Sequence, residues 1–81
     1  MIHTYIKRPV KIQAVKYTGD NVDEIAEFVG ADLIRGESLR IKTLEGEMLV
    51  SLNDFVIKGI QGEFYPCKPD VFADTYDLVE E

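Results

Sequence analysis

The sequence predicts a single α+β domain over residues 1 to 81, a small antiparallel β-rich fold of five to six short strands with one amphipathic helix and a short second helix. Three observations lead to this prediction. One segment repeats its apolar residues at the period of a helix, and several others alternate apolar with polar residues as strands do. The chain is 46% hydrophobic and 30% charged, a balance typical of folded domains, and its 81 residues are enough for one core only.

The N-terminal strand is expected at residues 10 to 14, where apolar and polar residues alternate. The alternation loses its phase at residues 15 to 17, as a bulge or a strand buried on both faces would require. Residues 18 to 21, Thr-Gly-Asp-Asn, then turn the chain.

The amphipathic helix is expected from residue 22 to residue 29, with its apolar face on the sheet. Its N-cap is Asn21, three residues before Glu24 as in a capping box, and Gly30 ends it. Acidic residues occupy the opposite face and favour the positive N-terminal end of the helix. Four apolar residues recur at helical spacing on one face: Val22, Ile25, Ala26 and Val29.

Two pairs of strands are expected after the helix. Residues 39 to 43 alternate and residues 48 to 50 return, with Glu45-Gly46 as the turn of a hairpin. Residues 55 to 58 and 63 to 65 form the second pair, joined by a glycine-containing loop. Pro66 cannot donate a backbone hydrogen bond, so it marks an edge strand or the end of pairing.

The C-terminal part is expected to contain a short helix and a last strand. Pro69 fits the first position of a helix over residues 69 to 74. Within this helix Val71 and Phe72 are expected to point inward. Tyr76 and Leu78 are then expected to close the domain as a short strand.

The net charge of −6 is unevenly distributed along the chain. Residues 1 to 19 carry four bases and no acid, residues 20 to 34 carry five acids and no base, and residues 69 to 81 carry five more acids. A net negative chain is not expected to bind DNA directly through its phosphates. The segregation leaves two alternatives open, charge pairing across the fold or two oppositely charged faces.

Cysteine and histidine content excludes several kinds of site. Cys67 is the only cysteine and His3 the only histidine, so neither an internal disulfide nor a zinc site built on several thiolates or imidazoles is expected. No metal or cofactor is expected. A lone thiol favours a reducing, cytoplasmic location, and no apolar run approaches the roughly 20 residues that span a membrane.

Catalysis is not expected, although Cys67 is a candidate nucleophile. It precedes Lys68, whose charge could lower the pKa of the thiol. A lone cysteine in a small domain is more often a small buried apolar residue. The chain contains no glycine-rich phosphate loop, no nucleophile elbow and no carboxylate pair in a pattern that separates two pKa values. We therefore expect a protein that binds rather than catalyses.

Residues 62 to 72 and the following Thr75-Tyr76 combine two prolines with four aromatic residues. Such a rigid run suits recognition because little conformational entropy is lost on binding. The alternative is purely structural, with Phe64 and Phe72 in the core. The exposed binding candidates of this run are then Tyr65, Lys68 and Tyr76.

The same run, Gly-Glu-Phe-Tyr-Pro-Cys-Lys-Pro-Asp-Val-Phe, resembles the C-terminal signature of a family of small uncharacterised proteins of tailed phages and prophages. The resemblance extends to residues 8 to 21, 41 to 47 and 55 to 59, and so covers most of the chain. The family has a PGDYG-like turn of Pro-Gly-Asp-aromatic type. Here the turn reads Leu-Asn-Asp-Phe at residues 52 to 55, and Asn53 can take the left-handed conformation. The resemblance implies a phage context and no established active site.

Three functions remain open at this point. The first is a phage-encoded binding protein of the host cytoplasm that antagonises host defence by sequestering a small anionic nucleotide-like ligand. The second is an acidic inhibitor that binds a host nucleic-acid-binding defence protein. The third is a structural or assembly protein of the virion. In the first, a homo-oligomer would enlarge a pocket lined by Lys42, Lys58, Tyr65, Lys68 and Tyr76.

Overall fold

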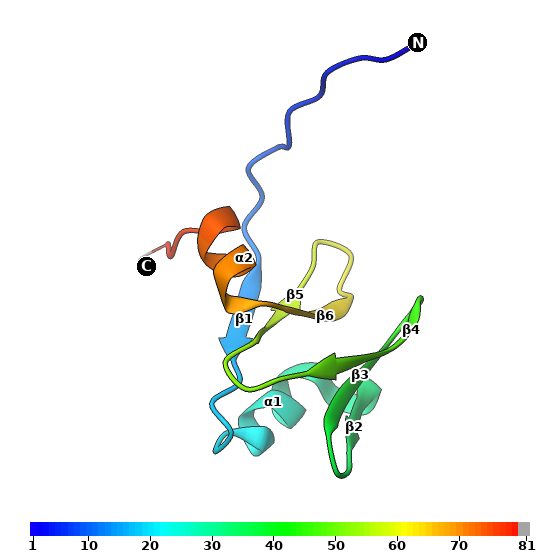
Figure 1. Cartoon of the computed structure of the whole chain (residues 1–81), viewed down its shortest axis with the longest axis vertical. Helices are drawn as coiled ribbons and strands as arrows, with labels where there is room; N and C mark the ends of the chain where they lie inside the picture. The colour runs from blue at the N-terminus through cyan, green and yellow to red at the C-terminus, as the bar shows by residue number, and fades with distance from the viewer. Residues whose placement is uncertain (80–81) are drawn as a thin grey trace.

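The computed structural model describes residues 1 to 79 and confirms a small, mostly β, α+β domain (Figure 1). An extended segment, residues 1 to 12, precedes the first element. In chain order the described elements are β1 (Gln13–Lys16), α1 (Val22–Val29), the 3₁₀ turn η1 (Gly30–Asp32), β2 (Leu33–Arg35), β3 (Leu39–Thr43), β4 (Gly46–Val50), β5 (Phe55–Lys58), β6 (Phe64–Cys67) and α2 (Pro69–Thr75).

The six strands form two three-stranded antiparallel sheets. The first sheet has the order β1-β5-β6 and the second the order β2-β3-β4. Both hairpins predicted from the alternation are confirmed, β3 with β4 and β5 with β6. Figure 1 shows the first sheet between α2 on one side and α1 with the second sheet on the other.

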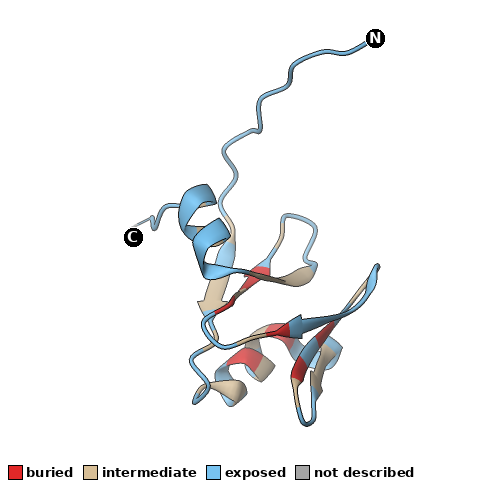
Figure 2. Ribbon diagram, in the orientation of Figure 1, coloured by how far each residue is buried: buried red, intermediate tan, exposed pale blue. Residues whose placement is uncertain are grey.

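The main core lies between α1, the second sheet and one face of the first sheet (Figure 2). Ile25 of α1, Ile41 of β3 and Val56 of β5 are fully buried. Phe28 and Phe64 close this core with an edge-to-face contact, their ring centroids 5.3 Å apart. The predicted apolar face of the helix is therefore confirmed, because its residues cover both sheets.

A second, smaller core lies on the other face of the first sheet. Neighbouring residues of a strand point to opposite faces, so Ile57 is buried there while Val56 serves the main core. Phe72 of α2 stacks on Phe55 of β5, with ring centroids 3.8 Å apart and planes 6° from parallel. The ring of Tyr76 packs against that of Phe72, with ring centroids 5.0 Å apart. The first sheet is thus covered on both faces.

Helix α1 begins and ends where predicted, but the side chain at its N-cap makes different hydrogen bonds from those of a capping box. Asn21 occupies the N-cap, but its side chain makes no capping bond to the helix. Its amide donates to the Lys16 carbonyl at 2.7 Å and to the Glu24 carboxylate at 2.8 Å, while its Oδ1 accepts from the Thr18 N–H. The side chain therefore ties the turn to β1. Gly30, with φ of 80°, ends the helix as predicted.

Strand β1 is shorter than predicted, because residues 10 to 12 do not pair and only Gln13–Lys16 form the strand. Its register against β5 is continuous, with Ala14 opposite Ile57 and Val15 opposite Val56. The loss of phase at residue 15 therefore reflects a strand buried on both faces rather than a bulge. Pro66 lies in the edge strand β6, opposite Val56, as the edge alternative predicted.

Two expectations for the C-terminal part are wrong. Val71 is 52% exposed, because Phe72 takes the inward position of this short helix and its neighbour is turned about 100° away. Tyr76 and Leu78 form no strand, since the ring of Tyr76 packs on Phe72 and keeps the chain beside the helix. The sixth strand is instead β2, which alternation did not reveal.

Candidate functional site

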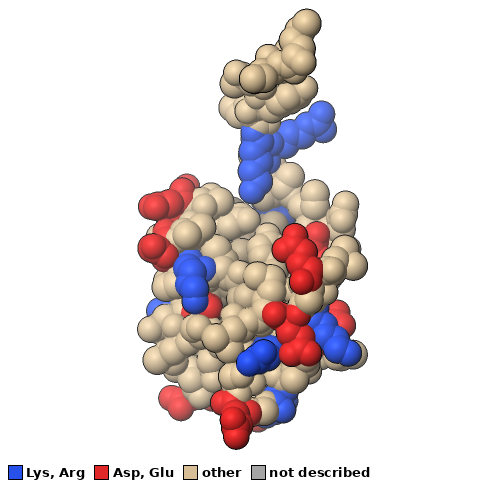
Figure 3. Space-filling model, turned by 45° about the vertical axis from the view of Figure 1, so that its right-hand side comes forward, with Lys and Arg blue, Asp and Glu red and all other residues tan. Residues whose placement is uncertain are grey.

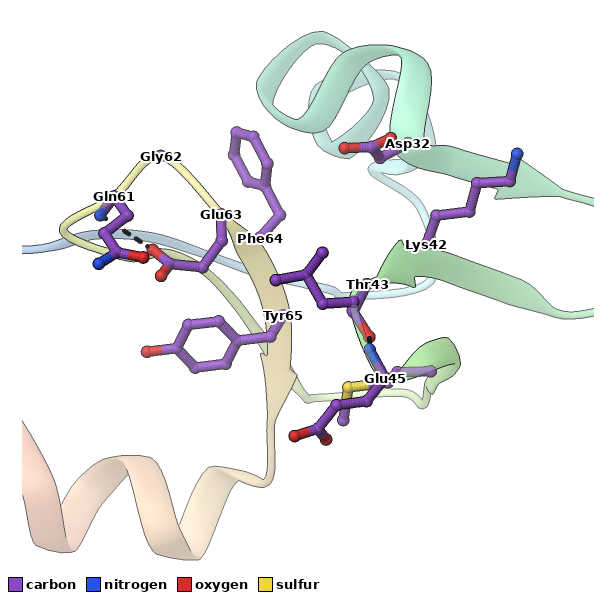
Figure 4. A pocket seen from close by; sticks show the side chains of 11 residues that line it. Asp32, Lys42, Thr43, Glu45, Gln61, Gly62, Glu63, Phe64 and Tyr65 are labelled. Atoms are coloured by element: carbon purple, nitrogen blue, oxygen red, sulfur yellow. Dashed lines mark hydrogen bonds between the residues drawn. The ribbon is translucent and has the colours of Figure 1, made fainter.

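A groove opens between the tip of the β3–β4 hairpin and the β5–β6 loop, with a cavity volume of about 790 Å³ (Figure 4). We call it the hairpin groove. Its apolar lining comes from Leu44, Met48, Phe64 and Tyr65, and its charged lining from Asp32, Lys42, Glu45 and Glu63. Segments far apart in the sequence therefore build one surface.

The hairpin wall is held by Thr43, the last residue of β3. Its hydroxyl donates to the Gly46 carbonyl at 2.7 Å and accepts from the Glu45 N–H at 3.2 Å. The bonds close the turn locally, which leaves Leu44 fully exposed at the tip. An apolar side chain in this position is available for contact with a ligand.

The opposite wall is a compact loop closed by Glu63. The Gly59 N–H donates to the Glu63 carbonyl at 2.8 Å, and the Gln61 N–H donates to the Glu63 carboxylate at 3.1 Å. A Cβ at Gly59 would collide with that carboxylate, so a larger residue there would require the Glu63 side chain to move. Both walls are therefore ordered by their own hydrogen bonds.

Two aromatic residues of β6 line the inner side of the groove. Phe64 is half-buried and fixed by its contact with Phe28 in the main core. Tyr65 is half-buried, and burial together with a hydrogen bond to Tyr76 raises its pKa to about 12. Nearby Glu63 and Cys67 act in the same direction. Tyr65 is therefore a neutral phenol at physiological pH.

The groove carries an excess of negative charge. Three carboxylates, those of Asp32, Glu45 and Glu63, line it with the single ammonium of Lys42. Figure 3 turns this side of the molecule forward and shows acidic side chains on it, with basic side chains among them. The electrostatics of the groove therefore favour a cationic ligand over an anionic one.

The structure brings together two of the five binding residues predicted from the sequence, Lys42 and Tyr65, in the hairpin groove. Tyr76 interacts with Tyr65 but lies on the α2 side of the first sheet. Lys58 is exposed, with its Nζ 6.0 Å from the centre of the Phe64 ring. Lys68 pairs with Asp54 instead. The five residues thus do not line a common pocket.

Lys68 forms an ion pair with the buried carboxylate of Asp54, at 3.5 Å. Asp54 is 2% exposed, and its Oδ2 also accepts from the Ser51 N–H at 2.8 Å. The Lys68 ammonium lies 3.5 Å from the Ser51 hydroxyl as well. Lys68 therefore fastens the end of β6 to the turn between β4 and β5.

The expectation that Lys68 lowers the pKa of Cys67 is wrong. Burial raises this pKa, and the carboxylates of Asp54 and Asp70 raise it further. The Lys68 ammonium is drawn to Asp54, and the Cys67 sulfur lies beside the Lys68 carbonyl instead, at 3.6 Å. At neutral pH the thiol form of Cys67 is favoured over the reactive thiolate.

A second groove, of about 800 Å³, lies between the N-terminal segment and α2. Residues 9 to 12 form one wall, and Phe55, Phe72 and Tyr76 lie opposite. The Lys7 ammonium lies 5.6 Å from the centre of the Tyr76 ring, a distance typical of a cation–π contact. This groove therefore lies where the N-terminal segment joins the domain.

Sequence reasoning missed the acidic residues of the hairpin groove. One local signal was present, because Leu44 is apolar in a turn and is followed directly by Glu45. Asp32 and Glu63 carry no such signal, since only the fold brings them to the hairpin.

Residues 1 to 79 contain neither a metal-binding cluster nor a membrane-spanning helix. No group of three or more His, Cys, Asp or Glu side chains in this range is placed to hold a metal ion. None of the described helices has the length and apolar character needed to cross a membrane. Comparison of the chain with protein-family models, with curated proteins and with solved structures finds no match.

Proposed function

We propose that this protein is a non-enzymatic binding module that holds a basic, partly apolar segment of a protein partner in the hairpin groove. The observation that supports this most strongly is the combination of an apolar lining with three carboxylates and one ammonium. Such a lining matches a peptide that carries both aliphatic or aromatic side chains and lysine or arginine.

Two groups of residues in the groove would contribute to binding in different ways, the aromatic residues and the carboxylates. Half-buried aromatic residues such as Phe64 and Tyr65 are suited to serve as anchors, because large rigid side chains give contact area at little entropic cost. The carboxylates at the groove steer and orient a cationic partner. The internal hydrogen bonds of both walls reduce the ordering that binding would require.

The resemblance to phage and prophage proteins supports a partner in the cytoplasm of the bacterial host. Host defence proteins that bind nucleic acid expose basic segments, and an acidic groove is able to occupy such a segment. The proposal therefore favours the acidic inhibitor over the two other functions left open by the sequence.

A small anionic nucleotide-like ligand is the main competing occupant. It is favoured by one observation, that Lys42 and Tyr65 line the same groove and could pair with a phosphate and stack on a base. A phosphate in the groove would also face the three carboxylates. We therefore expect nucleotides to bind more weakly than a basic peptide.

The test is a fluorescence-anisotropy titration of three labelled probes: a short synthetic peptide of lysine, arginine, isoleucine and tyrosine, its acidic counterpart with glutamate for the bases, and a nucleotide. The basic peptide should bind, and more weakly at high salt. The Asp32→Asn/Glu45→Gln variant should weaken it about fivefold to tenfold, as two charge contacts of 0.5 to 0.7 kcal/mol would at roughly 1.4 kcal/mol per tenfold.

The matched control is Glu27→Gln, which removes an exposed carboxylate from α1 outside the groove and should leave affinity unchanged. Tighter binding of the nucleotide than of the basic peptide would contradict the proposal and favour the anionic ligand. Equal binding of the basic and acidic peptides would contradict it as well. Recovery of the protein in purified virions would instead favour the structural or assembly role.

A further inference from the structure

The N-terminal segment, residues 1 to 8, leaves the domain as an extended arm (Figures 1 and 2). It contains four large apolar side chains that are almost completely exposed: Met1 (108%), Ile2 (98%), Tyr5 (87%) and Ile6 (94%). Apolar side chains gathered in one exposed segment are typical of an interaction site.

The charge of the arm complements that of the hairpin groove. Lys7 and Arg8 are the cations of the arm, and the chain contains no acid before residue 20. Among residues 1 to 79 the ion pairs involve Arg35, Arg40 and Lys68, so none takes up the N-terminal cations. The arm thus combines the two properties, basic and apolar, that the groove lining matches.

Residues 9 to 12, which join the arm to the domain, direct the arm away from the groove of its own chain. Residues 9 to 12 lie against the α2 side of the domain, where Lys7 contacts the ring of Tyr76. Figure 1 shows the arm continuing outward beyond α2, whereas the hairpin groove opens between the β3–β4 hairpin and the β5–β6 loop. The natural recipient of the arm is therefore another molecule.

We infer that the arm occupies the hairpin groove of a second copy of this chain. Its apolar side chains contact Leu44, Met48 and the aromatic residues of β6, and Arg8, which forms no ion pair among residues 1 to 79, lies at the carboxylates of the groove. Reciprocal exchange of arms gives a twofold dimer with two equal contacts. The inference rests on the proposed function, of which it names one partner, and implies that an external partner competes with the second copy for the groove.

The first experiment is sedimentation velocity of the full chain over a range of concentrations. The wild-type chain should dimerise reversibly, and more weakly at high salt. An arm variant, Ile2→Asp/Ile6→Asp, and a groove variant, Asp32→Asn/Glu45→Gln, should each raise the dimer dissociation constant at least fivefold. The control Val71→Asp changes a half-exposed apolar residue of α2 outside both grooves and should leave it unchanged.

Mixing the two variants gives the sharper test. The arm variant retains an intact groove and the groove variant an intact arm, so the mixture should form a heterodimer through one contact, more readily than either variant self-associates. A wild-type chain that stays monomeric at all concentrations overturns the inference. A dimer that both variants leave unchanged overturns it too, as does a compact monomer whose arm folds onto its own groove.

The outcomes separate this inference from the proposed function. A monomeric chain whose groove binds the synthetic basic peptide retains the proposed function and overturns the arm exchange. A chain that dimerises through arm and groove but binds no other basic peptide supports the arm exchange and overturns the proposal of a host partner for the groove.

Discussion

Phe72 of α2 lies parallel to Phe55 of β5, with ring centroids 3.8 Å apart and planes within 6°. This stack joins the C-terminal helix to the first sheet and shields one side of the second core. Without it a seven-residue helix has little to hold it in place, since isolated helices of this length are unstable in water.

Replacing Phe72 by alanine should therefore destabilise the whole domain. Both rings are half-buried, so we expect a loss of about 2 to 3 kcal/mol in the free energy of unfolding, below the range for a fully buried phenylalanine. Urea denaturation followed by circular dichroism measures it. The neighbouring control Val71→Ala should cost less than about 1 kcal/mol, and an equal loss in both variants would contradict the assigned role of the stack.

The Asp54–Lys68 ion pair should be strongly asymmetric. Asp54→Ala removes a buried acceptor from the Ser51 N–H and is expected to cost about 2 kcal/mol. Lys68→Met should cost about 1 kcal/mol or less, because the ammonium is 62% exposed and the carboxylate keeps its Ser51 bond. The two unfolding curves measure the difference. A larger loss for Lys68→Met would show that the charge pair, rather than the turn, carries the stabilisation.

Asn53 has a φ of 73°, the left-handed conformation that asparagine is expected to be able to take at this turn. Asn53→Val should cost about 1 to 2 kcal/mol, since a β-branched residue is strained in this region. Asn53→Gly should be neutral or nearly so, because glycine adopts the conformation without a steric penalty. Thermal denaturation of the two variants checks this. Similar melting temperatures for both would show that the turn relaxes around the larger side chain.

Stability should fall at high pH through Tyr65. Its pKa is about 12 in the folded chain against 10.0 for an ordinary tyrosine, so folding favours the neutral phenol. This contribution is complete below pH 10 and is lost as the pH rises toward 12. Free energies of unfolding measured across that range should decline less for Tyr65→Phe than for the wild type. Tyr5→Phe, at an exposed position, should follow the wild type.

Cys67 should react slowly as a nucleophile. Because burial and the carboxylates of Asp54 and Asp70 raise its pKa, the thiolate is scarce at pH 8. Reaction with a disulfide reagent should be several-fold slower in the folded chain than in urea. Asp70→Asn should increase the folded rate, while Asp74→Asn, farther along α2, serves as the control. A folded rate equal to that in urea would contradict the raised pKa.

Local patterns predicted much of the secondary structure, because their causes lie within a few residues. Helix α1 follows from its apolar spacing and from Gly30, and the hairpin of β3 and β4 follows from alternation, although its turn is Leu44-Glu45 rather than the predicted Glu45-Gly46, because Gly46 already pairs with Thr43. Strand β2 could not be predicted in the same way. It has only three residues, and its pairing is supplied by β3, with Leu33 opposite Ile41.

In the candidate site too, some features follow from local sequence and others only from tertiary packing. The sequence by itself determined that Lys42 lies at an exposed position of a strand, that the chain has a basic N-terminal segment, and that Asn53 can take the left-handed conformation, whereas Tyr65, expected to be exposed, is half-buried. Only the tertiary structure decided that Lys68 pairs with Asp54, fourteen residues away, and that Asp32, Glu45 and Glu63 share one groove. Periodicity reports which face a side chain takes on its own element. Its neighbours across the groove depend on how two sheets pack, which local spacing does not encode.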